Sequence, residues 1–161
     1  MIAHLFDWLA QTRLSNSLRF GVYYFPVLTI IHIVSIGLFG GTVMIANLRI
    51  LGAALQDIPV SRVFNQLRPW KWAGFFILLV TGIFMALSDP LEYRDNIMFW
   101  ISMLILLIVG VDAFNFSRGV FSSVQDWDEA PRAPERARAW AVRSLVLWTC
   151  LVFAGRATAF F

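Results

Sequence analysis

The chain has 161 residues, of which 59% are hydrophobic and only 14% are charged, and its mean hydropathy is +0.71. This composition excludes an ordinary soluble domain and predicts a single integral membrane domain. The net charge of +3 does not point to nucleic acid, because the cations follow the ends of the apolar segments. The single cysteine, Cys150, excludes an intrachain disulfide and a cysteine metal cluster.

The first segment, Met1–Leu14, predicts an amphipathic helix at the membrane surface. Apolar residues recur along one side of it at helical spacing. They are Ile2, Leu5, Phe6 and Leu9. The segment has neither a basic start nor a small-residue cleavage site, so we interpret it as mature sequence and not as a signal peptide. The alternative is a frayed beginning of the first membrane-spanning helix.

Four apolar segments follow, and each is long enough to cross a bilayer, which requires about 20 residues. They predict an all-α, four-helix membrane bundle that takes up the whole chain. Their approximate bounds are 20–48, 72–88, 96–116 and 138–160. A short interfacial helix is expected after Pro59, and Pro69 is expected to open the second span. Residues 117–137 are expected to form a polar linker with little order.

The basic residues predict the orientation of the bundle. Of the 13 Lys and Arg residues, 4 lie on the side of the two termini and 9 on the opposite side. The positive-inside rule therefore places the two long loops in the cytoplasm and both termini outside it.

His32 lies in the middle of the first span. An ionisable side chain in the hydrocarbon layer costs about 2 kcal/mol or more, so His32 is expected to face the bundle interior and to make a specific contact. A neutral imidazole is a common axial ligand of haem iron in helical bundles. A hydrogen bond to a helix carbonyl or a serine is the alternative. Copper suits the site less, because no cluster of His, Met and Cys accompanies His32.

The depth of His32 in the membrane indicates partners for such a haem. His32 is about 18 Å of helix from the outer end of its span, and Met103 lies at the nearest comparable depth on the third span. The second iron ligand would then be Met103 or the His32 of a second copy. Arg156 and Arg19 lie near the outer surface and are candidates to neutralise the haem propionates.

Asp112 and Asn115 share one face of the third span near its inner end. A carboxylate at that depth must be paired or protonated, and we expect Asp112 to pair with Arg49 or Arg118. The functional alternative is a proton-entry carboxylate.

Gly37 and Gly41 lie four residues apart in the first span and permit close approach of another helix. They point nearly opposite to His32, so a second copy of the chain or a partner subunit could pack there. Glycines that simply face lipid are the alternative.

Several weak motifs occur in an order that resembles a known family. They are Trp8, His32 with Gly37 and Gly41, the run Asn47–Gly52, Pro69 with Gly74 and Gly82, Tyr93 with Asn96 and Phe99, and Trp148 before Gly155-Arg156. The chain resembles a bacterial family of uncharacterised four-helix membrane proteins, which is distantly similar to the copper-resistance D and protoporphyrinogen-oxidase-like membrane proteins. The resemblance implies haem b or copper at His32 and a bacterial inner membrane. In that membrane the orientation expected from the basic residues makes both termini periplasmic. Asn47 and Ser102 depart from it, because aspartate and lysine are expected at those positions.

Two main functions remain open from the sequence. The first is a small haem b protein that transfers electrons between a donor at the outer surface and quinone or a partner oxidase. The second is a cofactor-free anchor or assembly subunit of a larger complex, and a homo-oligomeric proton or ion pathway is a third possibility. Paired carboxylates within the membrane, a phosphate-binding loop and a metal-ligand helix motif are all missing from the sequence, so the protein is at most a redox subunit rather than a hydrolase or transferase.

Overall fold

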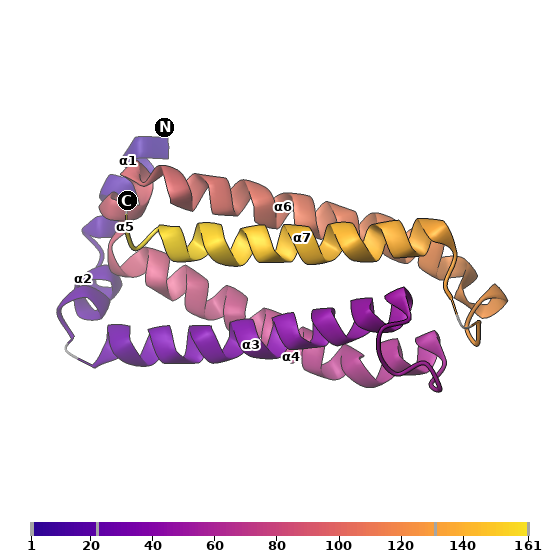
Figure 1. Cartoon of the computed structure of the whole chain (residues 1–161). Coiled ribbons are helices and arrows are strands. Elements are labelled where there is room, and N and C mark those ends of the chain that lie inside the picture. Colours follow the sequence, from indigo (N-terminus) through magenta and orange to yellow (C-terminus); the bar gives the residue numbers. More distant parts are fainter. Residues whose placement is uncertain (1, 22, 131, 161) are drawn as a thin grey trace.

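The computed structural model describes residues 2–21, 23–130 and 132–160, and within these residues the chain is helical. The elements are α1 (Ile2–Ala10), α2 (Arg13–Phe20), α3 (Tyr24–Leu51), α4 (Val60–Ser88), α5 (Pro90–Asp95), α6 (Ile97–Arg118), the 3-10 helix η1 (Val120–Asp126) and α7 (Glu135–Ala157). The helices α3, α4, α6 and α7 are long and apolar enough to cross a membrane, and they run side by side (Figure 1). The predicted helical membrane bundle is confirmed.

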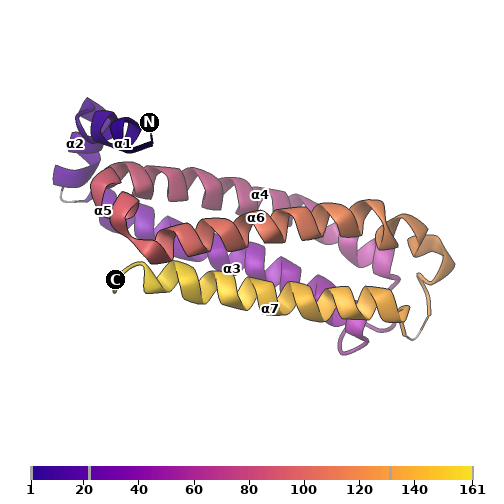
Figure 2. The same cartoon turned by 90° about the horizontal axis from the view of Figure 1, so that it is seen from above.

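The bundle is built from two pairs of neighbouring helices. Helix α3 packs most extensively against α4, α6 packs against α7, and the two pairs meet mainly where α3 contacts α7. Helices α4 and α6 follow one another along the chain, and α5 turns the chain from one into the other (Figure 2). These two helices nevertheless have little direct contact within the described residues.

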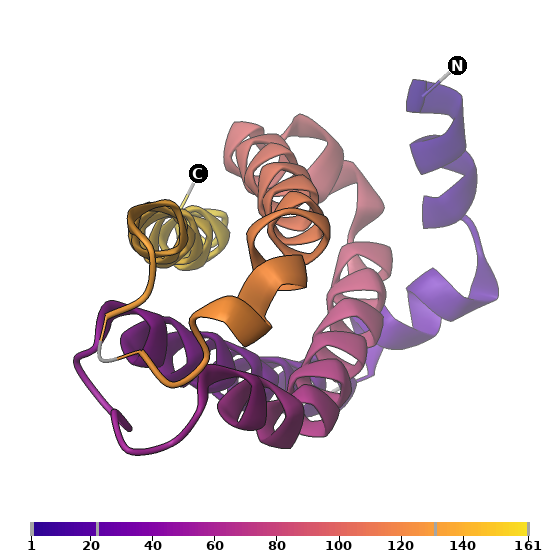
Figure 3. The same cartoon turned by 90° about the vertical axis from the view of Figure 1, so that its right-hand side faces the viewer.

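The N-terminal helices lie at the end of the bundle that carries both termini (Figure 1). Helix α1 runs across the bundle axis, as an interfacial helix would, and it lies outside the ring of long helices (Figure 3). The Ile2 side chain, part of the predicted apolar stripe, lies outside the described residues.

Residues 2–20 form two helices where one was expected, and the first span begins at Tyr24, close to the approximate bound of residue 20. The Thr12 hydroxyl accepts a hydrogen bond from the Ser15 N–H, at 3.2 Å between Oγ1 and N, and so caps the start of α2. Phe20 ends α2, and the first long helix begins only at Tyr24. This cap starts a second helix within the N-terminal segment, which the apolar pattern predicts as one helix.

Helix α4 is a single helix, so the predicted break before Pro69 is also wrong. Proline removes the N–H that would bond to the carbonyl of Asn65, one turn earlier. Asn65, Pro69 and Trp70 are exposed, so the freed carbonyl lies in a part of the helix outside the packed core. The missing hydrogen bond is therefore tolerated.

The main apolar core lies at the end of the bundle opposite to the termini. It consists of Ile50, Val60, Phe116, Val124, Trp127, Ala133, Ala137 and Ala141. Trp127 is only 7% exposed, and the ring of Phe116 stacks on Trp140 with 3.6 Å between centroids. The expectation of a linker with little order at 117–137 is wrong, because its few apolar residues are spaced so that they bury together.

Candidate functional site

The candidate site is a contact between His32 on α3 and Thr81 on α4. The His32 Nδ1 atom lies 2.8 Å from the Thr81 Oγ1 atom. The threonine is 4% exposed, and the histidine is half-buried. His32 was expected to make a specific contact inside the bundle. Its partner in that contact is Thr81 of the neighbouring helix.

The hydrogen bonds of Thr81 link the direction of its hydroxyl to the tautomer of His32. The Thr81 hydroxyl donates to the Ile77 carbonyl, at 2.7 Å, as threonines in helices commonly do. A hydroxyl has one proton, so while Thr81 donates to Ile77 its Oγ1 accepts from Nδ1–H of His32. In a neutral ring, Nε2 is then the unprotonated nitrogen, with a lone pair available to a ligand.

The His32 ring lies beside Gly82 of α4. A Cβ atom at Gly82 would lie 3.4 Å from His32 Cε1 and 4.0 Å from Nδ1. The Nδ1–Cε1 edge of the imidazole therefore faces the α4 backbone. A Cβ at this distance would make an ordinary van der Waals contact, so Thr81 rather than the glycine orients the ring.

His32 lies less deep than the sequence predicts. It follows the first residue of α3, Tyr24, by eight positions, which is about 12 Å of helix, whereas counting from residue 20 gives about 18 Å. Met103 follows the first residue of α6 by six positions, or about 9 Å. The two residues thus match in depth.

The contacts of the helices do not bring Met103 to His32. Helix α3 packs against α4 and α7, and α6 packs against α7. Met103 is 39% exposed on α6. Its role as a second iron ligand stays a prediction.

Arg19 and Arg156 both lie at the end of the bundle with the termini. Arg19 forms an ion pair with Asp89, at 3.1 Å between nitrogen and oxygen, so its charge is already compensated. The guanidinium of Arg156 lies over the Phe160 ring, 5.2 Å from its centroid, and the residue is exposed. Of the two arginines, Arg156 is better placed to receive an added anion.

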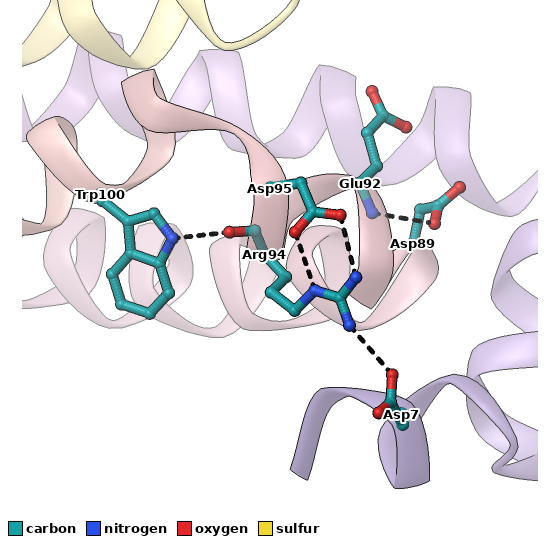
Figure 4. A network of polar contacts seen from close by, with 6 residues as sticks. All are labelled: Asp7, Asp89, Glu92, Arg94, Asp95 and Trp100. Carbon is teal, nitrogen blue, oxygen red and sulfur yellow. Dashed lines mark hydrogen bonds and ion pairs between the residues drawn. The ribbon is translucent and has the colours of Figure 1, made fainter. Parts of the chain in front are cut away.

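A polar network at the same end ties α1 to α5 (Figure 4). Arg94 bonds to Asp95, at 2.8 Å from Nε, and reaches Asp7 of α1, at 3.0 Å from the NH1 nitrogen. The hydrogen bond from Arg94 holds the pKa of Asp95 below its ordinary value, and these two carboxylates raise the pKa of Arg94. Sequence analysis missed this network, because Asp7 and Arg94 lie 87 positions apart.

We expect the Arg94–Asp95 pair, which holds the guanidinium that reaches α1, to be insensitive to pH between about 5 and 9. The pKa of Asp95 is lowered, so the pair with Arg94 is fully formed above the ordinary carboxylate pKa and is lost only as the pH falls through the lowered value. Arg94→Gln is expected to increase proteolytic cleavage between α1 and α2 across this range, whereas Arg13→Gln, an exposed arginine on α2, is not. Equal cleavage of the two variants would contradict the tether.

At the other end of the bundle, Asp112 pairs with Arg143 of α7. The prediction of Arg49 or Arg118 as its partner is therefore wrong. The Arg118 guanidinium instead lies over the Phe114 ring, 4.1 Å from its centroid. Asp112 pairs with an arginine that lies 31 residues further along the chain, and proximity in the sequence favoured the nearer candidates.

Arg49 is buried and 1% exposed. Its Nε donates to the Ile58 carbonyl at 2.6 Å, and its NH2 nitrogen lies 3.5 Å from the Asp128 carbonyl oxygen. The Asp128 carboxylate accepts hydrogen bonds from Ser61, at 2.7 Å from N and 2.6 Å from Oγ. Arg49 and Asp128 together fasten the two loops at this end to the start of α4.

The glycines that allow close helix packing within the chain differ from the predicted pair. A Cβ at Gly74 of α4 would lie 2.9 Å from the backbone N of Phe39, and one at Gly40 would lie 2.5 Å from Trp148 Nε1. A Cβ at Gly37 or Gly41 would meet nothing within 4 Å. Those two glycines leave an open surface on α3, and their packing against another chain stays a prediction.

A family comparison covers almost the whole chain. The model of the family of unknown function DUF6644 matches residues 5–161. The chain belongs to this family. No curated protein and no solved structure matches it. The expected uncharacterised family is confirmed, and the comparison assigns no activity to it.

The two residues that depart from the expected pattern are buried polar side chains. The Asn47 amide nitrogen donates to Ser144 Oγ at 3.1 Å, and its oxygen is buried without a partner among the described residues. The Ser102 hydroxyl donates to the Phe99 carbonyl at 2.7 Å. Each replacement leaves a neutral contact where a charged residue is expected.

The described residues contain no group of three or more His, Cys, Asp or Glu side chains that could hold a metal ion. A ligand held by one histidine, as in a haem site, needs no such group. His32 is thus the residue whose chemistry defines the candidate site.

Proposed function

We propose that the protein is a haem b subunit of the bacterial inner membrane, in which His32 is an axial ligand. The observation that supports this proposal is the orientation of the His32 ring by Thr81. Metal-ligating histidines commonly donate their other ring N–H to a neighbouring group, which fixes the tautomer and the ring position. The His32 Nδ1 atom has such a neighbour in Thr81, at 2.8 Å, and in the tautomer in which Nδ1 donates to it, Nε2 keeps its lone pair for a ligand.

A bound haem would supply one-electron transfer. The residues of this chain would hold and orient it. Thr81 fixes the imidazole, and the exposed Arg156 offers a positive charge at the end of the bundle with the termini. We propose periplasmic termini, an electron donor at that surface, and quinone or a partner oxidase as the acceptor. A distant similarity to copper-resistance D and protoporphyrinogen-oxidase-like membrane proteins belongs to the same proposal.

The test is the absorption spectrum of the protein purified in mild detergent, oxidised and then reduced with dithionite. We expect sharp reduced α and Soret bands. His32→Gly is expected to lose them, and added imidazole is expected to restore them by filling the vacated ligand position. His4→Ala, at the exposed second histidine, is the matched control and should keep the bands.

The outcomes separate a failed fold from a wrong proposal. Restoration by imidazole shows that the His32→Gly protein is folded. A wild-type protein without these bands, or a His32→Gly variant that keeps them without imidazole, contradicts the haem proposal.

A cofactor-free anchor or assembly subunit is the second candidate. The open surface at Gly37 and Gly41 favours it, because close helix packing needs such small residues. It predicts a colourless protein that co-purifies with a partner, and Gly37→Leu with Gly41→Leu is expected to release that partner.

A further inference from the structure

The two ring nitrogens of His32 have different surroundings. Within the described residues the side chain makes one hydrogen bond, which joins Nδ1 to Thr81. Nε2 has no partner there, and it is not enclosed, because the fully buried polar atoms without a partner belong to Asn47, Arg49 and Trp127. One nitrogen is therefore held by α4, and the other can be reached by a ligand.

The surroundings of Thr81 favour the tautomer of His32 in which Nδ1 carries the proton. The Thr81 Oγ1 atom lies 2.7 Å from the Ile77 carbonyl oxygen and 3.2 Å from that of Leu78, so its one proton has two acceptors within its own helix. While that proton is used there, Oγ1 is an acceptor for His32, and the ring must donate from Nδ1.

The partner of Nδ1 is also neutral. None of the ion pairs within the described residues includes His32, so no carboxylate contacts the ring there. An acceptor at the second ring nitrogen makes a ligating histidine a stronger electron donor. A hydroxyl does this less than a carboxylate, because hydrogen bonds to charged acceptors are about twice as strong. Thr81 therefore increases the electron donation of His32 by a small amount.

We propose that Thr81 tunes the reduction potential of a haem held at His32, by keeping the ring proton on Nδ1 and accepting it with a neutral oxygen. This role rests on the proposed function, since it concerns the same histidine. Electron donation by a ligand stabilises ferric iron relative to ferrous iron, and hydrogen bonds around the ligand help to set the potential. Loss of the Thr81 hydroxyl is therefore expected to raise the potential.

The position of the proton is measured first, on the full chain in detergent and free of haem. Selective isotope labelling of histidine nitrogen gives magnetic resonance signals from only two residues, His4 and His32, and His4→Ala assigns them. The chemical shifts distinguish protonated from unprotonated ring nitrogens. We expect Nδ1–H at His32 in the wild type and a mixture of both tautomers in Thr81→Val. A wild-type His32 with its proton on Nε2 overturns the proposal.

The reduction potential is measured next, by following the reduced α band of the haem-loaded protein during a redox titration. Thr81→Val keeps the shape of the side chain and removes its hydroxyl. At a fixed applied potential this variant is expected to raise the ratio of ferrous to ferric haem about fivefold, as for the loss of one ordinary hydrogen bond. That ratio corresponds to about +40 mV, at about 59 mV per tenfold for one electron. Thr81→Ser keeps the hydroxyl and should have the wild-type potential.

Ser35→Ala is the matched control on α3. Ser35 is 3% exposed and lies one turn from His32, but its hydroxyl donates to the Ile31 carbonyl of its own helix, at 2.7 Å. Removal of this hydroxyl should leave the potential unchanged.

The outcomes distinguish a failure of the tuning role from a failure of haem binding. Equal potentials of Thr81→Val and Ser35→Ala, in proteins that both contain haem, overturn the role of Thr81 and leave the proposed function in place. A wild-type protein without the α band overturns the proposed function and the tuning role together.

Discussion

Replacing Gly74 by alanine is expected to lower the free energy of unfolding by about 1–3 kcal/mol, the usual cost of overpacking a tight interface. The added Cβ would lie 2.9 Å from the backbone N and 3.1 Å from the Cα of Phe39. A backbone cannot move aside as a flexible side chain can, so α3 and α4 must separate. Gly74→Val is expected to cost more, because its two further methyl groups meet the same backbone.

Gly37→Ala is the matched control on the opposite helix of the same pair. Nothing lies within 4 Å of the position of its Cβ, so the change should be neutral or should raise stability by up to about 1 kcal/mol through helix propensity. Unfolding by sodium dodecyl sulfate, followed by circular dichroism in a common detergent, measures both variants. Equal stability of the two variants would show that α3 and α4 are not in backbone contact at Gly74.

The spacing of glycines in the sequence predicts which helix face can pack closely, but not which helix packs against it. The Gly37–Gly41 spacing identifies a helix face suited to close packing, but it does not say which neighbour is present. Gly74 and Gly40 make the close approaches inside the chain, and neither belongs to that pair. Their role depends on how α3 meets α4 and α7, which is a tertiary property.

The helix content and the four spans follow from the hydrophobic effect and could be predicted from the sequence. The ends of the helices could not be predicted, because they depend on single side chains whose local contacts leave only a weak pattern in the sequence. Thr12 divides the N-terminal segment into two helices, because one hydrogen bond to its hydroxyl caps the start of α2. Pro69 was expected to begin a helix but lies inside α4. The helix continues through it because the carbonyl that the proline leaves without a donor lies in an exposed part of the helix.

The candidate site could be predicted in part. The position of His32 in an apolar span indicates a buried, specific contact. Its partner could not be named, because Thr81 lies 49 residues away and a threonine in a helix ordinarily bonds only to its own backbone. Thr81 does both, and that double role orients the imidazole.

At the end of the bundle opposite to the termini, substitution of Arg49 is expected to destabilise the protein most. Arg49→Ala should lower the free energy of unfolding by about 3–5 kcal/mol. It removes the largest of the fully buried side chains, and truncation of large core residues to alanine costs about 2–5 kcal/mol. It also leaves the Ile58 carbonyl without this donor, and a buried unpaired polar group costs about 1–3 kcal/mol.

The Asp128 contacts extend the effect beyond the arginine itself. The Asp128 carbonyl also accepts the N–H of Val60, the first residue of α4, at 3.2 Å, and its carboxylate binds Ser61. Loss of Arg49 therefore frees the loop that caps α4. Proteolysis within residues 52–59 should increase together with the loss of stability.

Arg62→Ala is the control for the loss of a cation at the same end of the bundle. Arg62 is exposed on α4, and such surface changes ordinarily stay within about 0.5 kcal/mol. Arg49→Lys should fall between the two variants, because an ammonium group keeps the charge but cannot span both carbonyls in the fixed geometry of a guanidinium. If Arg49→Ala were as stable as Arg62→Ala, the two loops would be held by the apolar core alone, and the buried arginine would be unnecessary for the fold.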